Sequence, residues 1–226
     1  MIKSSYIAAV GLIAALSIAG TATADPGLTV TLGAHTVSAS GLSRGGNAVF
    51  FAVLREPIRG AYMDRVTRLA NVIIDDDRDG VVTFDLGRQI PPNSIWAVVE
   101  PQNGHYGIVT GPHLDLAMVP IPPDALRKGA GGAIDRIAFN HDSLELLYVH
   151  PGQGAWTWSA MDGDPSADAD GANGITIVSL NKAKPVGGGA QGITDLALGG
   201  TLVAIDPSRM QIGIVHIDGK LIGGAR

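Results

Sequence analysis

Four aspartates lie in the short segment DDDRDG, in which Asp75, Asp77 and Asp79 alternate ahead of Gly80. Carboxylates at this spacing can surround one hard cation, and the glycine permits the sharp turn that brings them together. An EF-hand is excluded, because its twelfth loop position requires a bidentate acid and that position here is Leu86. The segment therefore predicts a short calcium-binding turn between strands, completed by backbone carbonyls and water.

A second segment carries the same kinds of oxygen donor. Asp168, Asp170 and Asn173 lie in DADGANG, and Asp162 and Asp164 come shortly before them. This composition indicates a second calcium site of the same kind. Another interpretation stays open for both segments, because Asp, Asn and Gly are also the residues that exposed hairpin turns prefer.

The segment GLSRG (41–45) matches the G-x-S-x-G pattern around a hydrolase serine, and Asp195 and His216 follow in the order of a hydrolase triad. A nucleophile elbow needs a helix directly after its serine. The residues after Ser43, NAVFFAVL, instead predict a strand. We therefore expect a non-catalytic protein, and a secreted serine hydrolase that uses Ser43 is the alternative.

The elements that position these residues read as β-strands. Two segments alternate apolar with polar residues, and three are short β-branched and aromatic runs. They are TVTL (29–32), TVSA (36–39), AVFFAV (48–53), VVTF (81–84) and IWAVV (95–99). Strands that recur about every 8–12 residues between Gly, Pro, Asn and Asp turns are typical of an all-β sandwich or barrel.

The chain also resembles itself. Three blocks align in the same order: 28–54 on 135–161, 75–86 on 168–180, and 95–109 on 201–215. Such an arrangement indicates an internal duplication. The spacing predicts two tandem immunoglobulin-like β-sandwich repeats, 25–112 and 135–226, joined by a Pro/Gly-rich linker at 113–134. One larger two-sheet sandwich built from the two halves is the alternative.

The alignment bears on two tryptophans that alternate on a predicted strand. Trp156 and Trp158 project from one face of that strand, where a pair of indoles could stack sugar rings. In the alignment they fall on apolar positions of the first half. We therefore expect both side chains in the core.

The order of a strand, GLSRGG and then NAVFFAVL resembles the Gly-Leu-Ser-x-Gly-Gly turns of immunoglobulin-like domains in secreted bacterial proteins. The resemblance covers about half of the chain after its first 24 residues and points to no particular family within that class. It implies binding, adhesion or architecture more than catalysis. The expected partner is a protein or a glycan.

The composition narrows the function further. The chain has 226 residues, no cysteine and a formal charge of −5, which exclude a disulfide framework, a thiolate-ligated metal and a basic footprint for nucleic acid. Residues 1–24 have one charge, an apolar stretch and an Ala-Thr-Ala end, as in a Sec-type signal peptide cleaved near Ala24. We expect a secreted or periplasmic protein without a transmembrane span in its mature chain.

Overall fold

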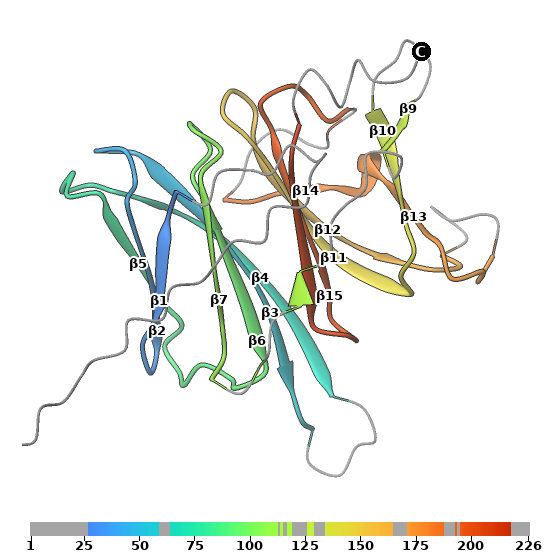
Figure 1. Ribbon diagram of the computed structural model, residues 1–226, viewed down its shortest axis with the longest axis horizontal. Helices are drawn as coiled ribbons and strands as arrows, with labels where there is room; N and C mark the ends of the chain where they lie inside the picture. Colours follow the sequence, from blue (N-terminus) through green and yellow to red (C-terminus); the bar gives the residue numbers. More distant parts are fainter. Residues whose placement is uncertain are drawn as a thin grey trace, which may run out of the picture.

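The computed structural model shows four β-sheets stacked side by side along the long axis of the molecule (Figure 1). It describes residues 27–58, 64–112, 114, 117–118, 126–128, 134–164, 171–187, 193 and 195–217. Among these residues there is no α-helix, and one 3-10 turn, η3, spans Leu180–Lys182. The predicted all-β sandwich class is confirmed.

The first half of the chain forms an outer and an inner sheet. The first outer sheet contains, in spatial order, β1 (Thr29–Leu32), β2 (Thr36–Ser40) and β5 (Val81–Asp85). The first inner sheet contains β4 (Arg65–Ile74), β3 (Asn47–Glu56), β6 (Ser94–Val99) and β7 (Tyr106–Thr110). This strand order is that of an immunoglobulin-like sandwich in which the fourth strand has joined the second sheet.

The second half forms another such pair. The second inner sheet contains β14 (Lys184–Pro185), β12 (Gly154–Met161), β11 (Ser143–His150), β15 (Thr201–Asp206), β16 (Gln211–His216) and β8 (Ala117–Met118). The second outer sheet contains β13 (Thr176–Ser179), β10 (Ile134–Phe139) and β9 (Leu126–Lys128). Strands β8 and β9 come from the segment predicted as a linker at 113–134, so part of that segment belongs to the second-half sheets.

The two inner sheets pack against each other face to face. A cluster of buried side chains joins Val49, Phe51 and Ala97 of the first inner sheet to Leu147 and Val203 of the second. Strands β6 and β15 are consequently buried along their whole length, whereas β1, β2 and β5 alternate between buried and more exposed residues. A continuous apolar run thus marks a strand covered on both faces, and the two halves share a core.

The pairing of β1–β7 occurs again in the second half. Strand β3 pairs with β4 and β6, as β11 pairs with β12 and β15. Strand β2 pairs with β1 and β5, as β10 pairs with β9 and β13. The two hairpins β6–β7 and β15–β16 complete the correspondence.

This pattern corrects one block of the sequence alignment. Setting 28–54 on 135–161 matches β1, β2 and β3 with β10, β11 and β12, which have different partners. The pairing instead matches β2 with β10 and β3 with β11. The error arose because successive strands share a two-residue period, so that a shift by one strand preserves the apolar matches. The other two blocks join strands with corresponding partners.

The prediction of buried tryptophans is confirmed. Trp156 and Trp158 are 5% and 3% exposed and lie in the core between the second inner and outer sheets. They lie on β12, which corresponds to β4 rather than to β3. The expectation was therefore correct for the face of the strand, although the alignment behind it was shifted.

Two buried carboxylates hold the loops at the ends of corresponding strands. Glu100 follows β6 and accepts a hydrogen bond from the backbone amide of Ser43 at 2.7 Å. Asp206 ends β15 and faces Nδ1 of His141 at 2.9 Å. In each half the carboxylate ties the chain ahead of the central strand, β3 or β11, to the end of its neighbour.

The pH dependence of unfolding tests this role for Asp206. Burial raises the pKa of Asp206, but hydrogen bonds from Ser208, Arg209 and His141 outweigh that effect, and the pKa lies below its ordinary value. The stabilisation is therefore present above the ordinary carboxyl pKa of about 3.9 and is lost as the pH falls through the lower folded-state value. We expect Asp206→Asn to lower the free energy of unfolding by about 1–2 kcal/mol at neutral pH.

Urea unfolding of the wild type and Asp206→Asn at several pH values measures this contribution. The difference between the two proteins should shrink below about pH 4, because the unfolded wild type then binds a proton at Asp206 that the folded wild type does not yet bind. A difference that stays constant down to pH 3 would show that the Asp206 charge does not stabilise the fold.

Candidate metal centre

The predicted calcium turn crosses from the first inner sheet to the first outer sheet. It leaves β4 at Asp75 and enters β5 after Gly80. Arg78 and Gly80 have φ angles of 61° and 79° in the left-handed region. A Cβ atom on Gly80 would also lie 3.0 Å from the carbonyl oxygen of Leu42, so this position suits only glycine.

Hydrogen bonds to the backbone hold Asp75 in place at the start of the turn. It is 2% exposed, and its Oδ2 accepts hydrogen bonds from the amides of Gly45 at 2.9 Å and Gly80 at 3.1 Å. Its own amide donates to the carbonyl of Gly46 at 2.9 Å. The other carboxylate oxygen, Oδ1, is buried and has no hydrogen-bond donor. Leaving a buried charged oxygen without a partner is costly, so this atom needs a water or a cation beside it.

The neighbouring carboxylates supply the rest of a cation site. One oxygen from each of Asp75, Asp77 and Asp79 lies within 4.8 Å of the other two. Calcium–oxygen distances of 2.3–2.6 Å allow two ligands of one ion to be about 5 Å apart, so this spacing suits a single calcium ion. Asp77 and Asp79 are exposed, which leaves that side of the cluster open to water ligands.

The pKa values of Asp75 and Asp77 are shifted because the three carboxylates lie close together. Burial raises the pKa of Asp75. Hydrogen bonds from the amides of Gly45 and Gly80 and from the adjacent Asp77 carboxyl lower that pKa by more, so the net shift is downward. The Asp79 amide lowers the pKa of Asp77, whereas a proton shared with Asp75 and the charge of Asp79 raise it above its ordinary value. The Asp77 carboxyl therefore binds a proton more tightly than an isolated aspartate does, and protons compete with a cation for it as the pH falls.

The second predicted site is only partly visible. Asp168 and Asp170 lie outside the described residues. Asn173 is exposed, and its Oδ1 accepts a hydrogen bond from the amide of Ile175 at 2.9 Å, as Oδ1 of Asp79 accepts one from Val81 at 2.8 Å. Within the described part of the chain, the three aspartates of the first turn are the one cluster that could hold a metal ion.

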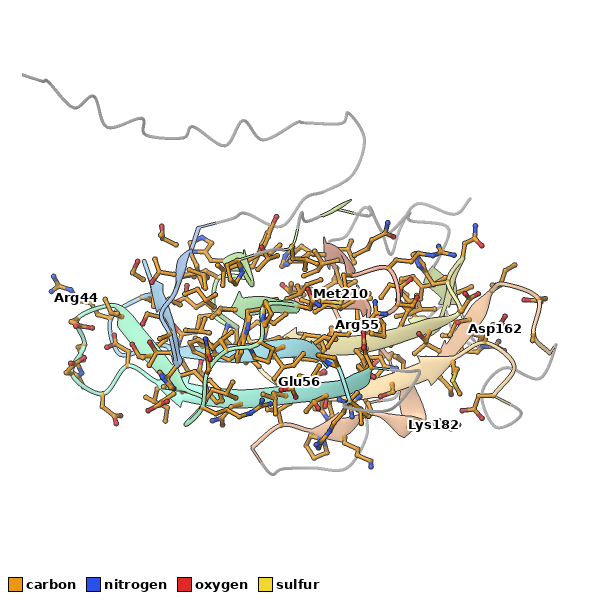
Figure 2. All side chains as sticks on the ribbon, turned by 90° about the horizontal axis from the view of Figure 1, so that it is seen from below. Arg44, Arg55, Glu56, Asp162, Lys182 and Met210 are labelled. Atoms are coloured by element: carbon orange, nitrogen blue, oxygen red, sulfur yellow. The ribbon has the colours of Figure 1, made fainter. Side chains whose placement is uncertain are left out.

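Asp162, which the calcium spacing does not select, corresponds to Asp75. Its Oδ2 accepts from the amide of Gly174 at 2.7 Å, and its own amide donates to the carbonyl of Asp142 at 2.9 Å. Its position one residue after a long strand is the sequence signal that could have identified it. Figure 2 shows Asp162 at the opposite end of the molecule from Arg44, which lies in the loop that Asp75 holds.

A cationic side chain from η3, after β13, reaches the second turn. Lys182 Nζ lies 3.0 Å from Oδ2 of Asp164. The corresponding position in the first half is Arg88, which pairs with Glu56 at the far end of β3 and not with the aspartate cluster. The two turns thus share a backbone scaffold and differ in how their negative charge is compensated.

Ser43 does not sit in a nucleophile elbow. Its Oγ accepts a hydrogen bond from Asn103 Nδ2 at 2.8 Å, and the chain after it enters β3 where the elbow requires a helix. His216, the histidine of the hydrolase alternative, has its Nδ1 3.3 Å from Thr201 Oγ1. The surroundings of Ser43 are those of a loop that Glu100 and Asn103 hold in place.

Comparisons of the chain with protein families, curated proteins and solved structures yield no match. Among the residues that the structure describes, no helix has the length and apolarity to cross a membrane. A functional assignment must therefore come from the geometry of the site.

Proposed function

We propose that this protein is an exported, non-catalytic binding or structural module whose first half is stabilised by one calcium ion at Asp75, Asp77 and Asp79. The observation that supports the ion is the buried Oδ1 of Asp75, which lacks a hydrogen-bond donor in a turn where oxygens of Asp75, Asp77 and Asp79 converge. Calcium favours such hard oxygen ligands, and extracellular modules bind it with dissociation constants of about 0.1–1 mM. Export supplies calcium at that concentration.

The ion has a structural role in this proposal. Through Oδ2, Asp75 holds both the loop before β3 and the start of β5, and so joins the two sheets of the first half. An ion on Oδ1 completes the coordination of that side chain and removes the repulsion between three neighbouring carboxylates. The proposal concerns the first turn alone, because Lys182 already faces Asp164 in the second.

Thermal unfolding of residues 25–226 in chelator and in calcium tests the proposal. We expect 10 mM calcium to raise the midpoint by about 3–10 °C, since saturating a site of this affinity stabilises the folded state by about 1.4–2.7 kcal/mol. The rise should diminish as the pH falls towards the carboxyl range, starting above the ordinary aspartate pKa of about 3.9, because protons then compete with calcium for Asp77.

Two variants separate a specific site from general charge screening. Asp77→Asn removes one ligand of the cluster and should abolish most of the calcium-dependent rise. Asp76→Asn makes the same charge change at the adjacent exposed residue, which lies outside the cluster, and should retain it. The calcium proposal would be abandoned if both variants responded as the wild type does, or if the wild-type midpoint did not move.

A further inference from the structure

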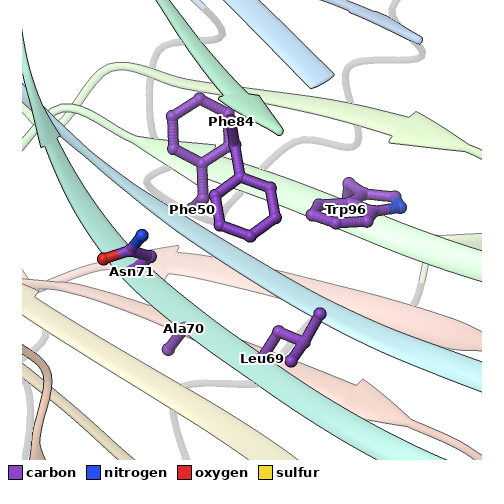
Figure 3. Close-up of a pocket in the computed structure, with 6 residues that line it drawn as sticks. All are labelled: Phe50, Leu69, Ala70, Asn71, Phe84 and Trp96. Atoms are coloured by element: carbon purple, nitrogen blue, oxygen red, sulfur yellow. The ribbon is translucent and has the colours of Figure 1, made fainter. Parts of the chain in front are cut away.

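A second candidate site lies in the first half, between its inner and outer sheets. A pocket of about 230 Å³ opens between β4 and β5 (Figure 3). Its lining consists of Phe50, Leu69, Ala70, Asn71, Phe84 and Trp96. Asn71 is exposed, so the pocket reaches the surface at that residue.

The walls of the pocket are apolar, and half of the lining side chains are aromatic rings. The Phe50 and Phe84 rings are stacked with centroids 5.9 Å apart, and the Phe84 and Trp96 rings are tilted with centroids 5.7 Å apart. Trp96 Nε1 donates to Ser94 Oγ at 3.2 Å, so its polar atom is already satisfied. Asn71 contributes the single polar side chain among the lining residues.

The second half shows what fills the corresponding space. Asn71 lies opposite Phe50 on β3, and Trp158 lies opposite Leu146 on β11, the strand that corresponds to β3. Two residues earlier on the same faces, Leu69 corresponds to Trp156. The second half therefore places two indoles, both almost fully buried, where the first half has a leucine and an amide.

Larger side chains at other corresponding positions fill part of that volume in the first half. Phe50 on β3 and Trp96 on β6 stand where the second half has Leu146 and Leu202, so these two positions carry aromatic rings in the first half alone. A pocket nevertheless persists beside β4. The pocket is open to solvent on the side of Asn71, and its apolar lining offers a small aromatic molecule a surface that it can cover.

We propose that this pocket binds a flat, uncharged aromatic ring of about the size of an indole, presented by a small-molecule ligand. Flatness follows from the phenyl and indole walls, which offer ring faces and edges for stacking. Neutrality follows because none of the described lining residues carries a charge that could compensate a buried charge. The volume suits a fragment rather than a larger ligand, whose pockets exceed about 300 Å³. The inference does not depend on the calcium site.

Titration with indole, followed by protein amide chemical shifts in NMR, tests the proposal. We expect saturable shifts at residues 69–71 and 84, with half-saturation below about 1 mM. Asn71→Trp fills the pocket as Trp158 does in the second half and should weaken indole binding at least about tenfold, beyond a 1.4 kcal/mol loss. Val66→Trp adds an indole at an exposed position of β4 outside the pocket lining and serves as the matched control, with binding retained.

A second filling variant keeps the test independent of one substitution. Leu69→Trp reproduces the other second-half indole and should also reduce binding, whether or not Asn71→Trp folds. The proposal is overturned if the wild type shows no saturable shift at about 5 mM indole, or if a folded filling variant binds as tightly as the wild type. In the first case the pocket is a packing defect, and a higher melting temperature of the filled variants would accompany that result.

Discussion

Trp158→Ala is expected to lower the free energy of unfolding by about 3–5 kcal/mol, whereas Asn71→Ala at the corresponding position should lower it by less than about 1 kcal/mol. Trp158 is 3% exposed and packs in the core of the second half, so that its removal leaves a large cavity. Asn71 is exposed, and its Oδ1 accepts a local hydrogen bond from the amide of Val72. The same position on corresponding strands is therefore part of the core in the second half and exposed in the first.

Chemical denaturation of both variants, with the m-value checked for two-state behaviour, provides the measurement. Asn71→Ala controls for the backbone effect of alanine at the corresponding inner-sheet position. Equal losses for the two substitutions would contradict the correspondence between β4 and β12 on which the pocket argument rests.

Arg68→Met should destabilise the contact between the two halves by about 2–3 kcal/mol at neutral pH. Arg68 Nη1 on β4 lies 3.0 Å from Oε2 of Glu145 on β11 and donates to Ser159 Oγ at 2.9 Å. Burial already raises the pKa of Glu145, although Ser159 and Arg68 lower it. Without Arg68 the carboxylate is left in a poorly solvated position with the Ser159 hydroxyl as its remaining partner in this group.

The sign of the pH dependence distinguishes this explanation from a packing effect. A carboxyl whose folded-state pKa is raised contributes stability below its unfolded pKa and loses that contribution as the pH rises through the folded-state value. Arg68→Met should therefore recover much of its lost stability towards pH 4, and Arg68→Met combined with Glu145→Gln should recover it at neutral pH. A loss that is the same at pH 4 and pH 7, and that the double variant retains, would indicate that the arginine stem and not its charge matters.

Much of the fold follows from local patterns in the sequence. The alternation in TVTL and TVSA predicted half-buried strands, and both are strands of the outer sheet. The apolar run after Ser43 predicted a strand, and it forms β3. These predictions succeed because the side-chain period of a strand is a property of consecutive residues.

For the candidate metal site, too, local spacing predicted one part and contacts between distant residues decided the rest. The alternating spacing of Asp75, Asp77 and Asp79 predicted a cluster, and their oxygens do converge. The spacing could not reveal that Oδ2 of Asp75 is occupied by amides while Oδ1 is buried without a donor, because Gly45 lies 30 residues away along the chain. It also selected Asn173 without Asp162, whose role depends on its contacts with Gly174 and Asp142.

The sequence by itself determined the strands, their turns, the absence of thiol chemistry and the position of one acidic turn. The tertiary structure decided which strands pair, that the inner sheets share a core, and where the tryptophan positions of one half become a pocket in the other. The physical reason is that every strand has the same two-residue period, so that local pattern alone cannot choose between partners. That choice depends on contacts between residues far apart in the chain, which form when four layers pack together.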